Sequence, residues 1–568
     1  MPRTPSRDPN AALRAGVAAY QQGRLEEAWA ILSALRHAKA LNIAAVCAQK
    51  LGRVEDAARA YGRASALAPT DPEIANNWGH FELGRGAVEA AGELFALALR
   101  GAPGMVAAEI GLAKVAAARK DWEAALAAWE RIVAAAPASV EGRYGRGVAL
   151  LETGRAEAAA GVFEALLQER GGPEVAFMLG RALLNLDRQD EAEARLREAH
   201  GQAPRAHTLR ALANLYWMRG ERGRFDALVR EGLTTLPLVA IKLLLEAGDV
   251  SGAQAAWEAC FAGRAPDADG WTLAAQIARI GGDGAGAAEA ADQALALAPG
   301  HAGASDTRVV ASLMMGAGTE TLDRLAELKA GEPLAQNWIA HESTACRLVG
   351  AEGGRGEGAP ALNDVERFVR AYDLGVPAGY GSVEGFNAAL AETLRRLHTF
   401  AGRPLDQSLR GAATQTTRSL LDRDEAVVRA YIAALEGPIR QYLSAIGTGA
   451  GHPTTARNTG GYRFQGMWSV RQTGGGFHEA HVHPEGWISS AYYVAVPDGI
   501  EGAEDKAGWI GFGAPPYPTE PSLEALKWVA PRVGRLVLFP SYMWHGTRPI
   551  AEGGERITAP FDLVPGPG

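Results

Sequence analysis

Prolines recur at a nearly constant interval through the first half of this 568-residue chain. The recurring prolines are Pro69, Pro103, Pro137, Pro204, Pro237, Pro266 and Pro299. The first two intervals are 34 residues long, and two of the later intervals are 33. An aromatic residue stands eight positions before the end of four consecutive units, at Tyr61, Phe95, Trp129 and Phe163. A period of this length is typical of stacked helix pairs, because a single pair cannot bury its apolar face without neighbours.

The turns between the expected helices also repeat. A glycine and an arginine precede an acidic, alanine-containing helix start at Gly23–Ala28, Gly52–Ala57 and Gly154–Ala158. Small residues allow the two helices of a pair to approach closely, and the proline ends the second helix. The pattern resembles the tetratricopeptide repeat. This resemblance implies an α-helical solenoid over residues 1–345, with about eight or nine units.

Solenoids of this kind have a concave groove, which usually holds a peptide or protein segment. We therefore expect a protein or peptide substrate to bind in the groove of the repeats. The alternative is that the repeats act as a dimerisation surface or as a spacer.

A change in composition follows the repeats. Residues 346–362 are rich in glycine and poor in apolar side chains, which is typical of a linker. Residues 363–453 then contain stretches with apolar residues at i, i+3 and i+4, which predict helices. From residue 454 to residue 568 the pattern is that of short strands, for example Ile488–Val496. The sequence therefore predicts a multidomain α+β protein.

A histidine cluster marks the strand-rich region. The chain has only 12 histidines, yet His478, His481 and His483 fall within six positions. On a strand, residues i and i+2 such as His481 and His483 point to the same face. His545 follows after the buried-strand pattern Arg535–Pro540. Three imidazoles from two strands can hold iron, zinc, copper or nickel, whereas structural zinc usually recruits cysteine, which is absent nearby.

The order of these elements resembles the iron- and 2-oxoglutarate-dependent oxygenases. It runs strand, His-x-His, strands, His545, and then a strand that begins with Arg556-Ile557-Thr558. Residues 476–497, 534–549 and 405–416 are also similar to bacterial oxygenases of this family that carry tetratricopeptide repeats. The resemblance covers roughly residues 363–568. It implies a double-stranded β-helix of the jelly-roll type, with buttressing helices.

The same resemblance implies a set of site residues. Fe(II) would be held by His481, His483 and His545, which with Arg556 would form the catalytic set. The family usually has a carboxylate at the position of His483. A second reading stays open, in which His483-Pro484-Glu485 is the His-x-Glu pair and Glu485 is a metal ligand. We expect His478 to be a loop residue or a hydrogen-bond donor behind the ligands.

2-Oxoglutarate would bind in the same pocket. Its C5 carboxylate requires a planar, permanently charged partner, which is the chemistry of arginine rather than lysine and points to Arg556. Thr558 lies two residues later on the same face and would add a hydroxyl. Tyr492 or Tyr493 would donate a further hydrogen bond.

Composition excludes several other classes of protein. The formal net charge of −8 gives no basic field for nucleic acid. Three widely spaced cysteines, Cys47, Cys260 and Cys346, form no disulfide framework and favour a reducing compartment. No secretory signal and no apolar run of membrane length is present. We therefore expect a cytoplasmic protein without a membrane or nucleic-acid partner.

The sequence thus favours a 2-oxoglutarate-dependent dioxygenase that hydroxylates a protein or peptide side chain recruited by the repeats. One alternative is a repeat scaffold whose jelly roll binds metal without catalysis. Another is a small-molecule oxygenase in which the repeats serve assembly. Arg556-Ile557-Thr558 favours the dioxygenase, because a domain without turnover has no need of a cosubstrate anchor.

Overall fold

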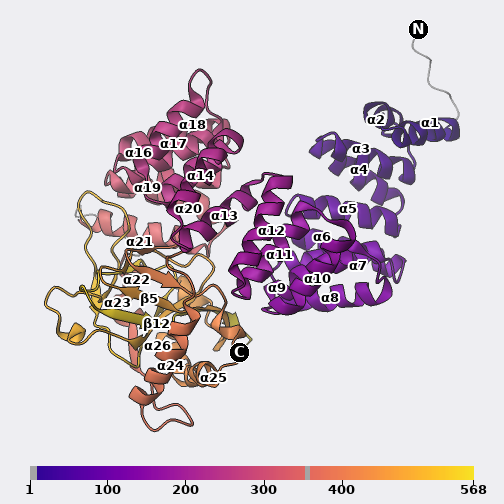
Figure 1. Cartoon of the computed structure of the whole chain (residues 1–568). Coiled ribbons are helices and arrows are strands. Elements are labelled where there is room, and N and C mark those ends of the chain that lie inside the picture. The colour runs from indigo at the N-terminus through magenta and orange to yellow at the C-terminus, as the bar shows by residue number, and fades with distance from the viewer. Residues whose placement is uncertain (1–8, 352–358, 568) are drawn as a thin grey trace. The chain divides into compact units, whose positions relative to one another are not determined.

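A computed structural model describes residues 9–351 and 359–567 of the chain (Figure 1). The chain divides into two compact units, Met1–Leu186 and Asp187–Gly568. Residues 352–358 of the predicted linker lie outside the described residues, as do residues 1–8 at the N-terminus. None of the described helices combines the length and the apolar character that a membrane span requires.

Helices fill the first 343 described residues. They are α1 (Pro9–Gln21), α2 (Leu25–Leu32), α3 (Ala38–Lys50), α4 (Val54–Leu67), α5 (Pro72–Gly84), α6 (Val88–Gly101), α7 (Val106–Ala118), α8 (Trp122–Ala135), α9 (Val140–Glu152), α10 (Ala156–Arg170), α11 (Pro173–Asn185), α12 (Gln189–Gln202), α13 (Ala206–Met218), α14 (Arg222–Thr235), α15 (Pro237–Glu246), α16 (Val250–Phe261), α17 (Ala268–Ile280), α18 (Gly284–Leu297), α19 (Ala302–Met314), α20 (Gly318–Gly331) and α21 (Gln336–Ala351). Nine pairs of described helices pack against each other, from α1/α2 to α9/α10 and from α13/α14 to α19/α20, in agreement with the expected eight or nine units.

The repeat pattern has the packing role that the sequence predicts. The four recurring aromatic side chains are almost completely buried: Tyr61, Phe95, Trp129 and Phe163. Phe95 lies so close to Gly111 of the next pair that a Cβ atom there would collide with the ring. Gly52, in the turn between α3 and α4, has φ +73, a conformation that favours glycine. The N-terminal part is therefore a solenoid of tetratricopeptide type.

Short helices and strands make up residues 359–567. The helices are α22 (Ala359–Leu362), α23 (Val365–Phe368), α24 (Val383–Leu397), η1 (Leu420–Asp422), α25 (Ala426–Ala434), α26 (Glu436–Ile446), α27 (Pro453–Ala456) and η2 (Ile500–Gly502). The strands are β1 (Arg370–Asp373), β2 (Leu409–Arg410), β3 (Ala413–Gln415), β4 (Gly461–Met467), β5 (Val470–Thr473), β6 (Phe477–His478), β7 (Ile488–Ala495), β8 (Ile510–Phe512), β9 (Lys527–Val529), β10 (Arg535–Pro540), β11 (His545–Thr547), β12 (Glu555–Thr558) and β13 (Phe561–Gly566).

The strands form one large and two small antiparallel sheets. The large sheet has the order β1-β10-β7-β12-β5-β3, and β13 joins it by pairing with β7 and β4. The small sheets are β11-β8-β9 and β2-β6. This arrangement is consistent with the expected jelly roll.

Helices α24, α25 and α26 cover one face of the large sheet (Figure 1). Their apolar side chains, such as Phe386, Tyr431 and Tyr442, share one core with Tyr492 and Leu536 of the sheet. The predicted buttressing helices are thereby confirmed. The cavity described below lies on the other face of the large sheet.

The segment 363–453 contains the predicted helices and also contributes the short strands β1, β2 and β3. The strand that contains Arg556 ends at Thr558 and a second strand begins at Phe561, because Pro560 cannot donate a backbone hydrogen bond and the ladder breaks there. One local expectation was wrong. The segment from His481 to His483 is a loop with one bridge to His545, not a strand.

Candidate metal centre

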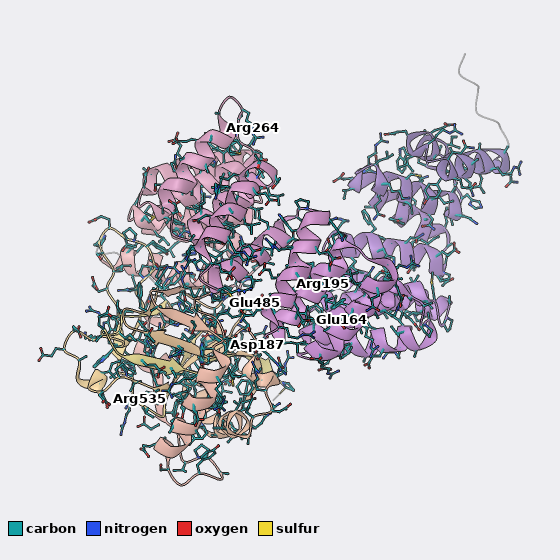
Figure 2. All side chains as sticks on the ribbon, in the orientation of Figure 1. Glu164, Asp187, Arg195, Arg264, Glu485 and Arg535 are labelled. Atoms are coloured by element: carbon teal, nitrogen blue, oxygen red, sulfur yellow. The ribbon has the colours of Figure 1, made fainter. Side chains whose placement is uncertain are left out.

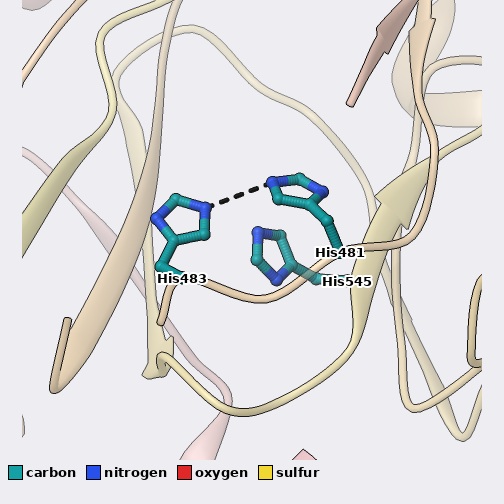
Figure 3. A group of neighbouring side chains, drawn as sticks. All are labelled: His481, His483 and His545. Atoms are coloured by element: carbon teal, nitrogen blue, oxygen red, sulfur yellow. Dashed lines mark hydrogen bonds between the residues drawn. The ribbon is translucent and has the colours of Figure 1, made fainter. Parts of the chain in front are cut away.

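Backbone hydrogen bonds place three histidines around one point (Figure 3). His481 and His545 exchange two backbone hydrogen bonds, of 2.9 and 3.1 Å. The N–H of His483 donates to the carbonyl of Ser541 at 3.0 Å. The possible ligand atoms of the three rings all lie within 4.8 Å of one another, so the group can hold a metal ion. The i, i+2 spacing therefore acts as predicted, although the backbone between the two histidines is a loop.

Two of the rings are oriented by backbone carbonyls. Nδ1 of His481 lies 2.8 Å from the carbonyl oxygen of Glu479, and Nδ1 of His545 lies 3.0 Å from that of Met543. A carbonyl only accepts, so each Nδ1 carries the proton. The lone pair of each Nε2 is then free to bind a metal.

The third ring is oriented by a carboxylate. Nδ1 of His483 lies 2.6 and 2.8 Å from the two oxygens of Asp562, which comes from strand β13. The hydroxyl of Ser489 donates to the same carboxylate at 2.7 Å. A histidine that donates to a carboxylate presents a more basic Nε2 to a metal.

Two of the imidazoles, those of His481 and His483, lie very close together. Nε2 of His481 and Nε2 of His483 are 3.1 Å apart. With both protons on Nδ1, these two nitrogens present lone pairs to one another, and a cation between them would relieve the repulsion. Burial lowers the pKa of His481 to about 3, with a further contribution from His483, and burial also holds the pKa of His545 well below its usual value. The His481 and His545 rings are therefore neutral at pH 7, which is the form of imidazole that binds a metal.

The histidines face a cavity of about 340 Å³ between the large sheet and the small sheets. Strands β12 and β13 contribute Arg556, Thr558 and Asp562 to its wall. The segment 405–416, one of the stretches similar to the oxygenases, also reaches the cavity through residues such as Gln407, Ser408 and Gln415.

Arg556 is the charged group on this wall. Its side chain is 2% exposed, and its Nε and Nη1 have no hydrogen-bond partner. Among the described residues no carboxylate pairs with it, and burial lowers its pKa. An unpaired buried cation is costly, so this guanidinium is suited to an anionic ligand.

Two more buried polar groups near Arg556 are also unpartnered. The Tyr493 ring centroid lies 5.2 Å from the guanidinium carbon, and the Tyr493 hydroxyl has no hydrogen-bond partner. Nε2 of Gln472 is likewise without a partner, and Gln472 lies directly opposite Arg556 on the neighbouring strand β5. Thr558 also lines the cavity, two residues after Arg556. Arg556 and Thr558 therefore give the cavity a polar wall, and Tyr493 and Gln472 lie beside Arg556.

The expectation for Tyr492 was wrong. Adjacent residues of a strand point to opposite faces, and Tyr492 points toward the helices, where its hydroxyl donates to Asn387 of α24 at 3.0 Å. Tyr493 is the tyrosine on the side of Arg556.

Glu485 and His478 occupy peripheral positions. Glu485 is exposed at the rim of the cavity and is not part of the group that can hold a metal (Figure 2). The His478 ring is nearly parallel to that of His481, with centroids 5.4 Å apart, and its Nδ1 lies 3.1 Å from the hydroxyl of Ser408. This placement favours His481, His483 and His545 as the ligand set.

Sequence reasoning missed Asp562, Gln472 and Trp468. Asp562 stands between Phe561 and Leu563 in a buried strand, and a carboxylate in such a position needs a partner, which was an available signal. Gln472 comes to lie opposite Arg556 only through the pairing of β5 with β12, and its local sequence carries no signal of this. The Trp468 ring stacks on His483 with centroids 5.8 Å apart, and nothing in its local sequence indicated this contact.

Comparison with known families assigns both parts of the chain. Residues 44–106, 110–175 and 238–302 match the tetratricopeptide repeat. Residues 466–562 match the family described as "Putative 2OG-Fe(II) oxygenase". The chain joins tetratricopeptide repeats to a domain of that oxygenase family. The match includes the three histidines, Arg556, Thr558 and Asp562, so residues 359–567 are called the oxygenase domain below.

Solved structures of repeat proteins resemble the helical part. A tetratricopeptide repeat protein from Parabacteroides merdae is 16% identical, with 48% of this chain and 98% of that chain covered and a TM-score of 0.33. The pilus biogenesis factor PilW is 18% identical, with 37% and 99% covered and a TM-score of 0.34. PilF of Pseudomonas aeruginosa is 18% identical, with 34% and 92% covered and a TM-score of 0.31. No curated protein matches the chain.

Proposed function

We propose that the oxygenase domain is an Fe(II)- and 2-oxoglutarate-dependent dioxygenase. His481, His483 and His545 would hold Fe(II) through their Nε2 atoms. Held by these three residues, the ion would bind the keto acid and activate O2, which is the chemistry that the metal would supply. The orientation of every ring by a hydrogen bond at Nδ1 supports this assignment.

The observation that carries the proposal is the state of Arg556. A buried guanidinium with free N–H groups lies in the same cavity as the three histidines. A dicarboxylate that binds the metal at one end would pair with Arg556 at the other. Thr558 and the unpartnered hydroxyl of Tyr493 would complete the hydrogen bonds of that carboxylate.

The reaction would be a hydroxylation. O2 is divided between two products: one oxygen atom enters the new carboxylate of succinate as CO2 leaves, and the other is inserted into a C–H bond of the substrate. The residues of the chain position the cosubstrate and exclude water from the buried end of the cavity.

We further propose that the substrate is a protein or peptide side chain. Tetratricopeptide repeats generally mediate protein interactions, and an array of packed helix pairs precedes the oxygenase domain. The cavity lining includes hydrogen-bonding groups, such as Gln407, Ser408 and Gln415, which could bind a polar side chain.

The test is direct. Purified protein is incubated with Fe(II), 2-oxoglutarate and O2, and succinate is measured with and without cell extract. We expect slow succinate formation alone and faster formation with extract. Binding of metal without any succinate would instead support a non-catalytic scaffold, and acceleration by the small-molecule fraction of the extract alone would support a small-molecule oxygenase. The Arg556→Ala variant, which retains the histidines, is the matched control.

A further inference from the structure

The odd-numbered helices form the inner layer of the repeats. Most odd-numbered helices contact the next odd-numbered one as well as the helix next to them in sequence, for example α13 with α15, α15 with α17 and α19 with α21. Among the described helices, even-numbered ones make no comparably extensive contact with one another. In a curved two-layer array the helices on the concave side lie closer together. The odd-numbered helices therefore line the concave face.

One segment of the oxygenase domain lies on the concave layer at α13. The N–H of Gly402 donates to the carbonyl of Met218 at 2.7 Å, and the N–H of Leu405 donates to the side-chain oxygen of Asn214 at 2.9 Å. The Arg403 guanidinium lies over the ring of Trp217, 5.7 Å from its centroid. Peptide ligands are held in the same way, by hydrogen bonds to their backbone and by a side chain that packs on an aromatic ring.

A second group of contacts lies on α21. The indole N–H of Trp544 lies 3.0 Å from the hydroxyl of Thr344 and 3.2 Å from the carbonyl of Ala340. His341 is hydrogen-bonded to the hydroxyl of Tyr517 at 3.0 Å. Asn214 and Thr344 are each the ninth residue of their helices, so both contacts use the same face of the repeat.

Apolar and backbone contacts extend this surface to α19. Val309, Val310 and Leu313 of α19 share a buried cluster with Tyr517 and Trp544 of the oxygenase domain. The turn after α19 approaches the domain so closely that a side chain at residue 316, a glycine, would collide with the carbonyl of residue 520. Nη1 and Nη2 of Arg347 donate to the carbonyls of residues 513 and 524, at 2.5 and 2.8 Å.

We propose that the concave face of α13, α19 and α21 is the docking surface for the oxygenase domain of the same chain. The repeat helices after Asp187 therefore serve as a structural part of that domain. This agrees with the division of the chain at Leu186/Asp187, which keeps these helices and the oxygenase domain in one compact unit.

The docked segments continue directly into the cavity. Leu405 is followed by Gln407 and Ser408 of the rim, and Trp544 precedes the ligand histidine His545. Val482, between the other two ligand histidines, packs against the same apolar cluster as Trp544. Asn214 and Trp544 are thus positioning residues. If the proposed function holds, a substrate segment cannot occupy this face without displacing the supports of the cavity.

A cleavable sequence inserted between Ala351 and Ala359 of the full chain tests the docking. After complete cleavage, we expect the two fragments to elute together in size exclusion at low micromolar concentration. Separate elution would overturn the proposal. This result does not depend on metal, cosubstrate or turnover, so it stays distinct from a failure of the proposed function.

The α13 contact is tested by hydrogen exchange in the uncut chain. Asn214→Ala should increase exchange of the Leu405 amide by about tenfold, the factor that one net hydrogen bond represents. Asn77→Ala is the matched control, because Asn77 of α5 donates to Asn42 within the repeats at 3.3 Å. Equal exchange in Asn214→Ala and wild type would show that α13 does not hold the segment.

The α21 contact is tested by metal binding. Trp544→Phe keeps an apolar ring and removes the N–H that is directed toward Thr344. We expect weaker Co(II) binding and a changed Co(II) absorption spectrum, because the backbone of His545 loses its support. Thr344→Val removes one of the two acceptors on α21 and leaves the Ala340 carbonyl and Trp544 intact, so it should have a smaller effect in the same direction. An unchanged affinity and spectrum in both variants would contradict a positioning role.

Discussion

Asp562 lies 2.6 Å from Nδ1 of His483, behind the ring as seen from the three-histidine centre. The oxygenase family usually has a carboxylate as the second metal ligand, and in the proposed ligand set this chain has an imidazole there. A carboxylate is present nonetheless, one hydrogen bond further from the position that the metal would occupy. A proton shared between Asp562 and His483 would make the imidazole a stronger donor and offset part of the missing charge.

Asp562→Asn should therefore weaken Fe(II) or Co(II) binding by about 10- to 100-fold, the usual effect of losing such a partner. The amide oxygen can still accept from Nδ1, so the ring should stay in place while the charge is lost. Competition with a chelating dye measures the change. Ser489→Ala keeps the carboxylate and should have a smaller effect; equal affinity in Asp562→Asn and wild type would contradict the role.

The identity of the second ligand is tested by a pair of alanine variants. His483→Ala should remove most of the bound metal, because two remaining imidazoles make a weak site. Glu485→Ala should leave the metal content unchanged, because Glu485 is exposed at the rim. Metal analysis of the purified variants gives the answer. The opposite outcome would make His483-Pro484-Glu485 the ligand pair.

Arg556 should govern the affinity for 2-oxoglutarate. Arg556→Ala strands the carboxylate and should cost roughly 3–5 kcal/mol, about a hundredfold or more in affinity. Arg556→Lys retains the charge without the planar fork and should fall between this variant and wild type. Thr558→Ala should cost about 1 kcal/mol, the value of one hydrogen bond. Titration of the metal-loaded protein with 2-oxoglutarate measures all three, and the metal content should not change.

The two adjacent tyrosines supply an internal control for this titration. Tyr493→Phe removes the unpartnered hydroxyl near Arg556 and should weaken 2-oxoglutarate binding by a few-fold. Tyr492→Phe removes the hydroxyl that donates to Asn387 on the opposite face and should leave cosubstrate affinity unchanged. An effect in Tyr492→Phe alone would place the cosubstrate elsewhere.

His398 should make the oxygenase domain less stable in acid. Burial, followed by the charge of Arg471, lowers the pKa of His398 to about 4, compared with 6.5 in the unfolded chain. Its stabilising contribution is therefore fully present above about pH 6.5 and is lost as the pH falls toward 4. The loss is on the order of 3 kcal/mol at most, since one pKa unit corresponds to about 1.4 kcal/mol.

Urea unfolding at pH 7.5 and pH 5.0 measures this effect. His398→Gln can still hydrogen-bond to Thr414 and Ser469 but cannot be protonated in this range. The variant should lose less stability than wild type between the two pH values. Equal losses would show that His398 does not contribute, because the other buried histidines are the same in both proteins.

Sequence predicted those features that depend on short-range pattern. The proline and aromatic period indicated the solenoid, and the spacing of His481, His483 and His545 indicated the ligand group. Features that depend on which distant segments meet were not predicted. Asp562 lies 79 residues from His483, and the choice between Tyr492 and Tyr493 depends on the face of β7 that the helices cover.

The boundary between the two compact units also could not be predicted from the sequence pattern. A change in composition after residue 345 led us to expect a separate repeat domain, and residues 1–345 would have been the natural deletion. The contacts of Asn214, Thr344 and Arg347 with the oxygenase domain show that such a deletion would remove its supports. The segments of the oxygenase domain that contact the repeat helices have no periodic sequence pattern from which the contact could be predicted.

The division at Leu186/Asp187 also has a thermal consequence. Two compact units with separate cores need not melt together, so calorimetry of the full chain should resolve two heat-absorption peaks. Metal and 2-oxoglutarate stabilise only the folded form of the unit that binds them, so one peak should move to higher temperature and the other should stay. The helices from α12 to α21 should melt with the peak that moves, and the earlier repeats with the peak that does not.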